Sequence, residues 1–351
     1  MDVTTIATAT HERVLRIEDA ASGLTGFIAV HSTALGPAAG GLRMRPYATE
    51  QEALTDVLRL SRGMTYKNAA ADLPLGGGKA VILGNPAHKT DAMLRAMGRA
   101  IDGLGGAYWT AEDMGMSPAD MAVIREETPY VAGLPDGAHA SGDPSPITAR
   151  GIFYAIRVTA RALWHSPVLS GRRVAVQGLG HVGWHLCKLL RAAGADLVVA
   201  DMDADRAALA AQCFGAEVVP ADQILRVPAD ILAPCAIGGV LTADTIPHLQ
   251  VRAVCGGANN QLGDDRDGDA LHAREILYAP DYVVNAGGIV NVATEILRID
   301  DRPGFVADKL CALEKTLAAI YAKAKAEQVG PHRVADLTVE DRLAPSAQAA
   351  E

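Results

Sequence analysis

The sequence predicts an α/β protein of two domains, the second of them built on a doubly wound parallel sheet. The chain has 351 residues, and at about 150 residues per domain this length corresponds to two domains. After Ser145, short apolar runs alternate with helical patterns, which is typical of parallel strands joined by helical crossovers. A glycine-rich turn joins the strand at Arg173–Gln177 to the helix that follows it, which supports the same fold class.

Composition narrows the classes of partner. Lys and Arg number 32 against 41 Asp and Glu, and this formal charge of −9 argues against nucleic acid as the main partner. Apolar runs fall short of the ~18 residues of a membrane span and the N-terminus lacks a signal-peptide pattern, so we expect a cytoplasmic protein without a membrane partner. The cysteines are odd in number and lack CxxC spacing, so we expect buried, reduced thiols and no metal site: Cys187, Cys213, Cys235, Cys255 and Cys311.

The first domain is expected over residues 1–140, where Gly26–His31 and Lys79–Leu83 are predicted strands. A helix is predicted from Thr49, because Thr49 and Glu52 form a T-x-x-E capping box. The residues that follow place one face of that helix toward a core: Leu54, Val57, Leu58 and Ser61.

The second domain is expected over residues 141–325. Two prolines and two glycines punctuate residues 141–151, which we interpret as a hinge, with a helix beginning at Thr148. A later helix is predicted over about Phe305–Ala324, and residues 326–351 are expected to pack back on the first domain with a frayed end after Pro345. The predicted elements between are a strand at Arg173–Gln177, a helix at His181–Ala193, a strand at Leu197–Asp201 and short strand-like runs at Glu217–Val219, Asp230–Ala233, Ala253–Cys255 and Tyr282–Asn285.

The glycine-rich turn has the spacing G-x-G-x-x-G and predicts a dinucleotide site. Its first glycine permits a tight turn, its second lets the backbone approach a pyrophosphate, and its third packs helix against strand at the positively polarised helix N-terminus. Asp201, 23 residues after Gly178, ends the next strand and can accept hydrogen bonds from ribose hydroxyls while repelling a 2′-phosphate, which favours NAD over NADP. The predicted cofactor-binding residues of this turn are Gly178, Leu179, Gly180, His181, Val182 and Gly183.

A second glycine cluster, Gly76–Gly78, precedes Lys79. It is not a P-loop, because Leu73 stands where the first glycine of that motif is required and Ala80 stands where Ser or Thr must follow the lysine. Lys67 and Lys79 each lie beside small residues, and two lysines in one desolvated cleft would lower the pKa of one of them enough for it to act as a base. Two solvated surface lysines remain the alternative.

A carboxylate pair, Glu112 and Asp113, follows the apolar Tyr108 and Trp109. A carboxylate just past a strand end is well placed for proton transfer, and a helix cap is the alternative interpretation of the same residues.

Several motifs occur together in one order: GPAAGG (36–41), RGMTYKNA (62–69), LPLGGGKAVI (73–82), AEDMG (111–115), SGDPSPITARG (141–151), GLGHVG (178–183), GGANNQL (256–262) and NAGGIVNV (285–292). Over about residues 25–325 the chain therefore resembles the Glu/Leu/Phe/Val amino acid dehydrogenases, most closely their leucine and phenylalanine dehydrogenase branch. The resemblance implies a substrate-binding and oligomerisation domain followed by a Rossmann domain, with a cleft between them. It implies NAD-dependent oxidative deamination of an L-amino acid to a 2-oxo acid and ammonia, by a homo-oligomer.

The resemblance also implies residue roles. Lys79 would be the general base and Asp113 the proton relay, while Lys67 would bind the substrate carboxylate, helped by backbone N–H groups of Gly40 and Gly41. On the cofactor side, Thr148 would hold the nicotinamide carboxamide, and Asn259 or Asn260 would lie near the nicotinamide ribose.

The positions that line the side-chain pocket in this family are all apolar here, which argues against glutamate as substrate: Ala39, Met64, Ala111, Ile289 and Val292. Leucine-specific members usually carry Leu where this chain has Ala39, so the pocket has room for a bulkier side chain, and the substrate stays open between the leucine and phenylalanine types. Two other hypotheses are a catalytically silent NAD-binding regulatory protein, disfavoured by the presence of Lys79 and Asp113, and a 2-hydroxy acid dehydrogenase, disfavoured by the lack of a histidine in the glycine–lysine cluster.

Overall fold

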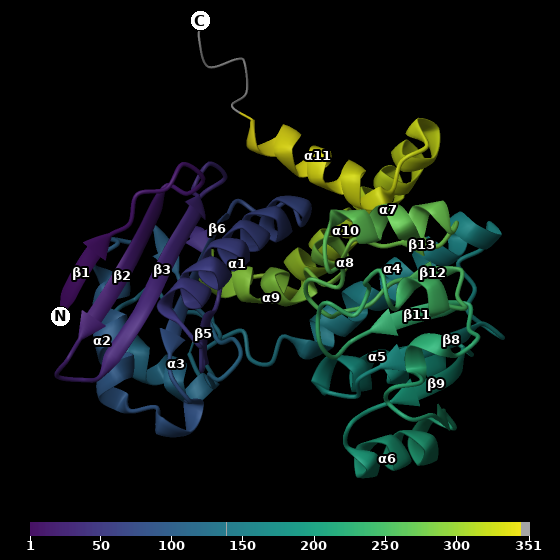
Figure 1. The fold of residues 1–351 in the computed structure, drawn as a ribbon, viewed down its shortest axis with the longest axis horizontal. Helices are drawn as coiled ribbons and strands as arrows, with labels where there is room; N and C mark the ends of the chain where they lie inside the picture. Colours follow the sequence, from purple (N-terminus) through teal and green to yellow (C-terminus); the bar gives the residue numbers. More distant parts are fainter. Residues whose placement is uncertain (138, 345–351) are drawn as a thin grey trace, which may run out of the picture. The chain divides into compact units, whose positions relative to one another are not determined.

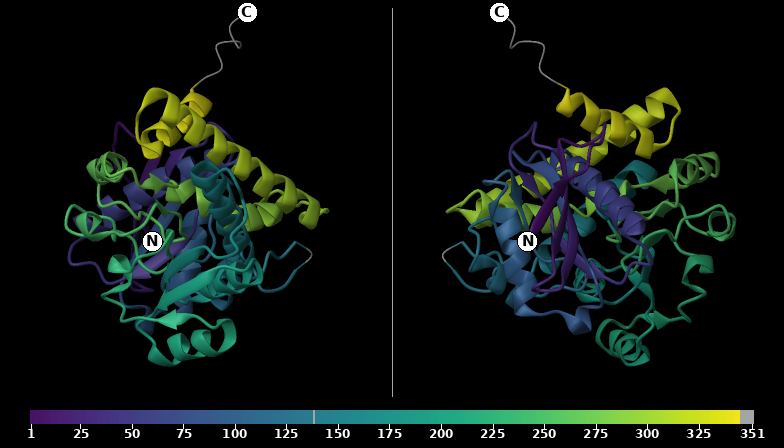
Figure 2. Two further views of the ribbon diagram at one scale, coloured as in Figure 1. Left: turned by 90° about the vertical axis from the view of Figure 1, so that its right-hand side faces the viewer. Right: turned by 60° about the vertical axis from the view of Figure 1, so that its left-hand side comes forward.

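The computed structural model describes residues 1–137 and 139–344, and the chain divides into two compact units (Figure 1). The first unit contains residues 1–143 and 289–306, and the second contains residues 144–288 and 307–344. The strands of each unit can be followed by colour in Figures 1 and 2, purple to blue in the first and teal to green in the second. Each unit is described by itself below.

The first unit holds a mixed sheet in the order β1-β2-β3-β6-β4-β7, with β5 paired to β6. Strands β1, β2, β3 and β6 are antiparallel neighbours, while β4 and β5 run parallel to β6. Helix α1 packs against β3 and β6, and helix α2 packs against β2, β3 and α3. The bounds are β1 Asp2–Thr5, β2 Arg13–Asp19, β3 Leu24–Ser32, β4 Ala38–Ala39, β5 Leu42–Arg45, α1 Glu50–Ala70, β6 Gly76–Leu83, α2 Asp91–Asp102, β7 Tyr108–Trp109 and α3 Pro118–Arg125.

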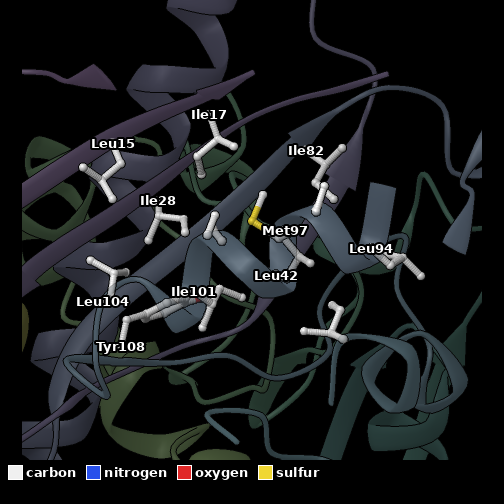
Figure 3. Close-up of a cluster of buried hydrophobic side chains, with 14 of the residues drawn as sticks. Leu15, Ile17, Ile28, Leu42, Ile82, Leu94, Met97, Ile101, Leu104 and Tyr108 are labelled. Carbon is white, nitrogen blue, oxygen red and sulfur yellow. The ribbon is translucent and has the colours of Figure 1, made fainter. Parts of the chain in front are cut away.

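Side chains of β3 alternate between two cores. Phe27 and Ala29 pack with Ala53 and Val57 of α1. Ile28 and Val30, which alternate with them, join the larger core on the other face of the sheet. Figure 3 shows this core around Ile28, Leu42, Met97 and Tyr108. The period-2 pattern of a strand therefore decides which face each residue of the neighbouring strands reaches.

This register places the charged residues of β5 and β6 on the α1 face. Lys79 pairs with Ala29 across the β3–β6 ladder, so its side chain lies on the same face as Ala29. Leu42 and Met44 of β5 belong to the larger core, so Arg43 between them points to the α1 face.

The second unit holds a parallel sheet in the order β10-β9-β8-β11-β12-β13. The chain starts at β8 in the middle, runs outward to β10, and then returns to β11 on the other side of β8. This is the order of a doubly wound Rossmann sheet, in which ligands bind at the carboxyl ends of the strands where the order reverses. The bounds of the remaining elements of the chain are α4 Ser145–Trp164, β8 Arg173–Gln177, α5 His181–Ala192, β9 Asp196–Ala200, α6 Ala204–Phe214, β10 Glu217–Val218, β11 Ile231–Pro234, β12 Ala253–Val254, α7 Asp265–Ala273, β13 Leu277–Tyr278, α8 Asp281–Val284, α9 Gly287–Ile296, α10 Arg302–Glu327 and α11 Pro331–Leu343. Most of α9 and the start of α10 belong to the first unit.

Two predicted elements differ from the structure. The run Tyr282–Asn285, taken as a strand, lies in helix α8, and the strand of this region is β13, four residues earlier. A short buried apolar run does not by itself distinguish helix from strand, and Pro280 at the N-cap begins the helix here. Helix α4 begins at Ser145 rather than Thr148.

The chain returns to the first unit in the middle of the expected second domain. Residues 289–306 belong to the first unit because three of their side chains hold its loop 133–141. Glu295 accepts hydrogen bonds from the backbone N–H groups of Gly133 and Ser141, Asn291 donates to the Ser141 carbonyl oxygen at 2.9 Å, and Arg302 donates to that oxygen at 3.1 Å. The chain first enters the second unit after residue 143, against the expected 140.

The sequence predicts that the C-terminal segment packs back on the first domain, and for the described part of it this prediction is wrong, because that part packs on the second unit. Helix α11 contacts α7 and β13. Arg333 pairs with Asp269 of α7, and the Tyr282 hydroxyl donates to Asp336 at 2.8 Å. The frayed end predicted after Pro345 lies outside the described residues.

The cysteines are all free thiols, and their burial differs from the prediction. Cys187 and Cys255 are buried and Cys235 is partly buried, but Cys213 and Cys311 are exposed. Within residues 1–137 and 139–344, no helix combines the length and the apolar character needed to cross a bilayer.

Candidate active site

An ion pair joins the two residues predicted to be catalytic. The Nζ atom of Lys79 lies 2.9 Å from Oδ2 of Asp113; the Lys79 side chain is 7% exposed and the Asp113 side chain 24%. Burial raises the pKa of the Asp113 carboxyl, but the positive charges of Lys79 and Arg43 and their hydrogen bonds outweigh this effect and lower the pKa to about 2. Asp113 is therefore a carboxylate at neutral pH, and the helix-cap alternative does not describe it.

Sequence reasoning missed Arg43. Its Nε donates to Asp113 Oδ2 at 2.9 Å and its Nη1 donates to Asp56 Oδ2 at 3.1 Å. Asp56 lies on α1, is 7% exposed, and also accepts a hydrogen bond from the Tyr47 hydroxyl. The alternation Leu42-Arg43-Met44-Arg45 after a glycine pair is the signal that predicts charged side chains facing α1 at this strand.

The glycines around Lys79 serve packing in the first unit. A Cβ at Gly77 would lie 2.1 Å from the backbone nitrogen of Thr65 on α1, and one at Gly78 would lie 2.6 Å from the Tyr108 ring. We expected these glycines to admit a ligand; the structure shows that they admit helix α1 on one face and Tyr108 on the other. Close approach of α1 is what brings Lys67, in its last turn, to the face of the sheet that carries Lys79.

Gly40 and Gly41, which precede β5, were expected to donate their N–H groups to the substrate carboxylate, and for Gly40 the structure shows another partner. The Gly40 N–H donates to the Trp109 carbonyl oxygen at 3.1 Å, so the sheet already uses it and it is not a donor for a substrate carboxylate. A Cβ at Gly41 would lie 2.9 Å from the Asp113 Cβ, so Gly41 allows Asp113 to approach the strand. Lys67 and the Gly41 N–H are left as the candidates for holding a carboxylate.

The five predicted pocket residues all belong to the first unit, although they lie up to 253 positions apart in the chain, and all are apolar. Met64 on α1 reaches Gly40, since a Cβ built there would lie 2.9 Å from the Met64 Cγ. Ala39 precedes Gly40 on β4 and is fully buried. The remaining three are 8% to 9% exposed: Ala111, Ile289 and Val292.

The glycine-rich turn of the second unit has the conformation that its spacing predicts. Gly178 has a φ of +91°, which favours glycine. A Cβ at Gly183 would lie 2.0 Å from the Gly178 carbonyl oxygen, so the third glycine packs α5 against the turn. A Cβ at Gly180 would meet no protein atom within 4 Å. Gly180 occupies the N-cap position of α5, and no side chain accepts a hydrogen bond from the first N–H groups of this helix there. Open space before an uncapped helix N-terminus fits the pyrophosphate of a dinucleotide; His181 and Val182 begin that helix, and Leu179 is buried.

Asp201 lies at the carboxyl end of β9 and contacts this turn. Its Oδ2 accepts a hydrogen bond from the Leu179 N–H at 2.6 Å, and its Oδ1 accepts one from the Asp203 N–H at 2.9 Å. The residue therefore also holds the turn in place, a role that the sequence motif does not reveal.

The other predicted cofactor residues also belong to the second unit: Thr148 lies in the first turn of α4, and Asn259 and Asn260 follow β12. The Thr148 hydroxyl donates to the Pro144 carbonyl oxygen at 3.0 Å, which leaves its oxygen able to accept a hydrogen bond from a carboxamide. Asn259 and Asn260 are exposed after β12, and Asn285 Nδ2 donates to Asn259 Oδ1 at 3.0 Å. Asn285, which was not predicted, thus orients Asn259. In the part of the chain that is described, no three His, Cys, Asp or Glu side chains gather as a metal site would require.

Comparisons with known proteins agree with this arrangement. A family model described as Glu/Leu/Phe/Val dehydrogenase, dimerisation domain, matches residues 11–130, and one described as Glutamate/Leucine/Phenylalanine/Valine dehydrogenase matches residues 199–334. The chain is 46% identical to a leucine dehydrogenase of Geobacillus stearothermophilus over 95% of its own length and 90% of that protein. It is 46% identical to a phenylalanine dehydrogenase of Caldalkalibacillus thermarum, over 95% and 91%. The crystal structure of L-tryptophan dehydrogenase from Nostoc punctiforme superposes with a TM-score of 0.83 at 43% identity, covering 95% of this chain and 96% of that one.

Proposed function

Because the chain belongs to the Glu/Leu/Phe/Val dehydrogenase family and is thus an amino acid dehydrogenase, we propose that it oxidatively deaminates an apolar L-amino acid with NAD⁺. One water is consumed, the products are the 2-oxo acid, an ammonium ion, NADH and a proton, and the same residues serve the reverse reductive amination. The observation that carries this proposal is the ion pair of the buried Lys79 with Asp113, because amine oxidation needs both a proton acceptor for the substrate ammonium and a base for water.

The pair divides these proton transfers. The Asp113 carboxylate takes a proton from the substrate ammonium, so that the neutral amine can support loss of hydride from Cα. Its depressed pKa means that it passes the proton on instead of retaining it. Lys79, once neutral, takes the proton of the water that attacks the imino carbon, and Lys67 holds the substrate carboxylate by charge.

NAD⁺ supplies the hydride acceptor when it is bound. The family uses NAD or NADP, and the choice of NAD is supported by Asp201, whose carboxylate at the end of β9 would repel a 2′-phosphate. The open space at Gly180 and the uncapped start of α5 support binding of the pyrophosphate by the second unit.

The preference for a substrate with an apolar side chain is supported by the five predicted pocket residues, which belong to the same unit as Lys79 and Asp113. Ala39, Met64, Ala111, Ile289 and Val292 offer no cation for a second carboxylate, so glutamate is disfavoured. Ala39 on β4 has a small side chain, which supports a pocket that accepts aromatic as well as branched side chains.

A panel of L-amino acids tests the function. We expect NADH formation at alkaline pH with leucine, valine, isoleucine, phenylalanine or tryptophan, and little with glutamate. Absence of turnover with every apolar member of the panel, for a protein that still binds NADH, would overturn the proposal.

We also propose a homo-oligomer assembled through the first unit. The match to a family model named for dimerisation and the exposed edge strand β1, whose four residues all face solvent, support it. Light scattering on the purified protein should give at least twice the mass of one 36.6 kDa chain, and a monomer would overturn it.

A further inference from the structure

Two cations share one oxygen of the Asp113 carboxylate. Lys79 Nζ and Arg43 Nε both lie 2.9 Å from Oδ2. The cations approach from neighbouring parallel strands, Arg43 from β5 and Lys79 from β6. The charge of Asp113 is therefore divided between a lysine that must lose a proton to act as a base and an arginine that keeps its charge at any working pH.

From this geometry we propose that Arg43 is a positioning residue for proton transfer. Its guanidinium fixes the Asp113 carboxylate and draws part of the negative charge away from the Lys79 ammonium, so that less of that charge opposes proton transfer from Lys79. The inference rests on the proposed function, because it concerns the base and the relay assigned there.

The surroundings restrict Arg43 to this task. Its side chain is 15% exposed, and its second nitrogen is held by Asp56 of α1 at 3.1 Å. The guanidinium is thus fixed at two points, which a lysine at this position would not reproduce. Such a two-point contact sets the position of Asp113 as well as its charge.

The charged and titratable groups that face Asp113 come from four elements. Lys79 lies on β6 and Arg43 on β5, while Asp56 on α1 balances Arg43 from the far side. Tyr108 on β7 is buried nearby, with its hydroxyl donating to the Gly40 carbonyl oxygen at 2.7 Å. Lys79 and Arg43 are the two charges that lower the pKa of Asp113, so removing Arg43 leaves Lys79 to compensate the carboxylate alone.

Arg45 provides a matched control on the same strand. It lies two residues further along β5 and pairs with Glu52 at 3.0 Å and with Asp56 at 3.8 Å. It thus shares Asp56 with Arg43, while its ion pairs are made to Glu52 and Asp56. Arg45→Gln removes a cation from Asp56 and leaves the contacts of Lys79 and Arg43 to Asp113 Oδ2 in place.

The test is the pH profile of kcat/KM for the best substrate of the panel. In Arg43→Gln, which keeps a hydrogen-bond donor but loses the charge, we expect the acidic limb to move up by about 1 pH unit. Turnover should fall about tenfold on that limb and recover at alkaline pH. Arg43→Lys, which keeps the charge but loses the two-point contact, should keep the limb of the wild type with a lower kcat, and Arg45→Gln should keep the wild-type profile.

The outcomes separate this inference from the function itself. A wild type without amino acid turnover contradicts the proposed function before any variant is compared. An active wild type together with an Arg43→Gln profile that is lower but unshifted shows a merely structural arginine and overturns the inference alone. If Arg43→Gln does not fold, Arg43→Lys decides, because a shifted limb in a variant that keeps the charge contradicts the inference.

Discussion

The first unit builds its site from charged side chains, and the second unit builds its site from backbone. In the first, Lys79, Arg43 and Asp113 meet in ion pairs at 2.9 Å. In the second, glycines shape a turn that leaves open space before α5, and one carboxylate holds that turn. A charge cluster is altered by replacing one functional group at constant shape, whereas a backbone turn is altered by adding a single carbon atom. The two sites should therefore fail in different ways.

The largest expected effect is at Lys79. Lys79→Ala should lower turnover at least about 10³-fold, because the attacking water loses its base, while NADH binding measured by fluorescence stays within about twofold of wild type. Lys89, which pairs with Asp120 in the same unit, is the matched control, and Lys89→Ala should retain turnover. Substantial turnover in Lys79→Ala would remove Lys79 from the role of base.

Asp113 should show a pH-dependent loss of stability as well as a loss of rate. Its pKa of about 2 lies below the ordinary 3.8, so the carboxylate stabilises the fold above about pH 4, and this contribution disappears as the pH falls towards 2. Asp113→Asn should lower the free energy of unfolding by about 2 kcal/mol at neutral pH, and the difference from wild type should shrink on acidification. Urea unfolding at a series of pH values measures it, and a difference that stays constant with pH would contradict the ionised pair. Turnover should fall about 10²-fold.

Two glycines of the turn should separate folding from binding. Gly183→Ala places a Cβ 2.0 Å from the Gly178 carbonyl oxygen and should lower the melting temperature, because backbone must move. Gly180→Ala meets no protein atom within 4 Å and should melt like wild type, yet weaken NADH binding about tenfold if a pyrophosphate approaches there. Unchanged affinity in a stable Gly180→Ala would show that the dinucleotide does not approach this glycine.

The smallest effect is expected in the side-chain pocket. Ala39→Leu adds volume at a fully buried position and should shift the ratio of kcat/KM for phenylalanine over valine downward by about tenfold, since pocket methylenes contribute ~1–3 kcal/mol. The ratio of two substrates on one enzyme preparation is independent of the folded fraction. If the ratio does not change, position 39 does not line the pocket.

The sequence predicted the geometry of the glycine-rich turn better than that of the charge cluster for a physical reason. The G-x-G-x-x-G turn is local, so its spacing alone predicted the close contacts of Gly178 and Gly183 and the position of Asp201. The first site depends on strand register, which no single motif carries. Arg43 was therefore missed, and Gly40 was assigned an N–H that the sheet already uses.

Domain limits were harder still to predict. Helix α9 runs across the boundary at Gly288, so no local signal marks the return of residues 289–306 to the first unit. Hydrogen bonds attach residues 289–306 to the first unit: Glu295 accepts from Ser141, and Asn291 donates to the Ser141 carbonyl oxygen. These partners are more than 140 positions apart in the chain. Contacts at such separations leave no local trace in the sequence.

The attachment of Glu295 to Gly133 and Ser141 affects how the protein is made. During synthesis, the loop at 133–141 leaves the ribosome long before the carboxylate that binds its N–H groups. At about 5–20 residues per second, the first unit waits about 8–30 seconds for its last segment, while residues 144–288 of the second unit are made in between. For the same reason, we expect an exchange of the second unit between relatives to need two inserts, 144–288 and 307–344, that leave residues 289–306 with the first unit.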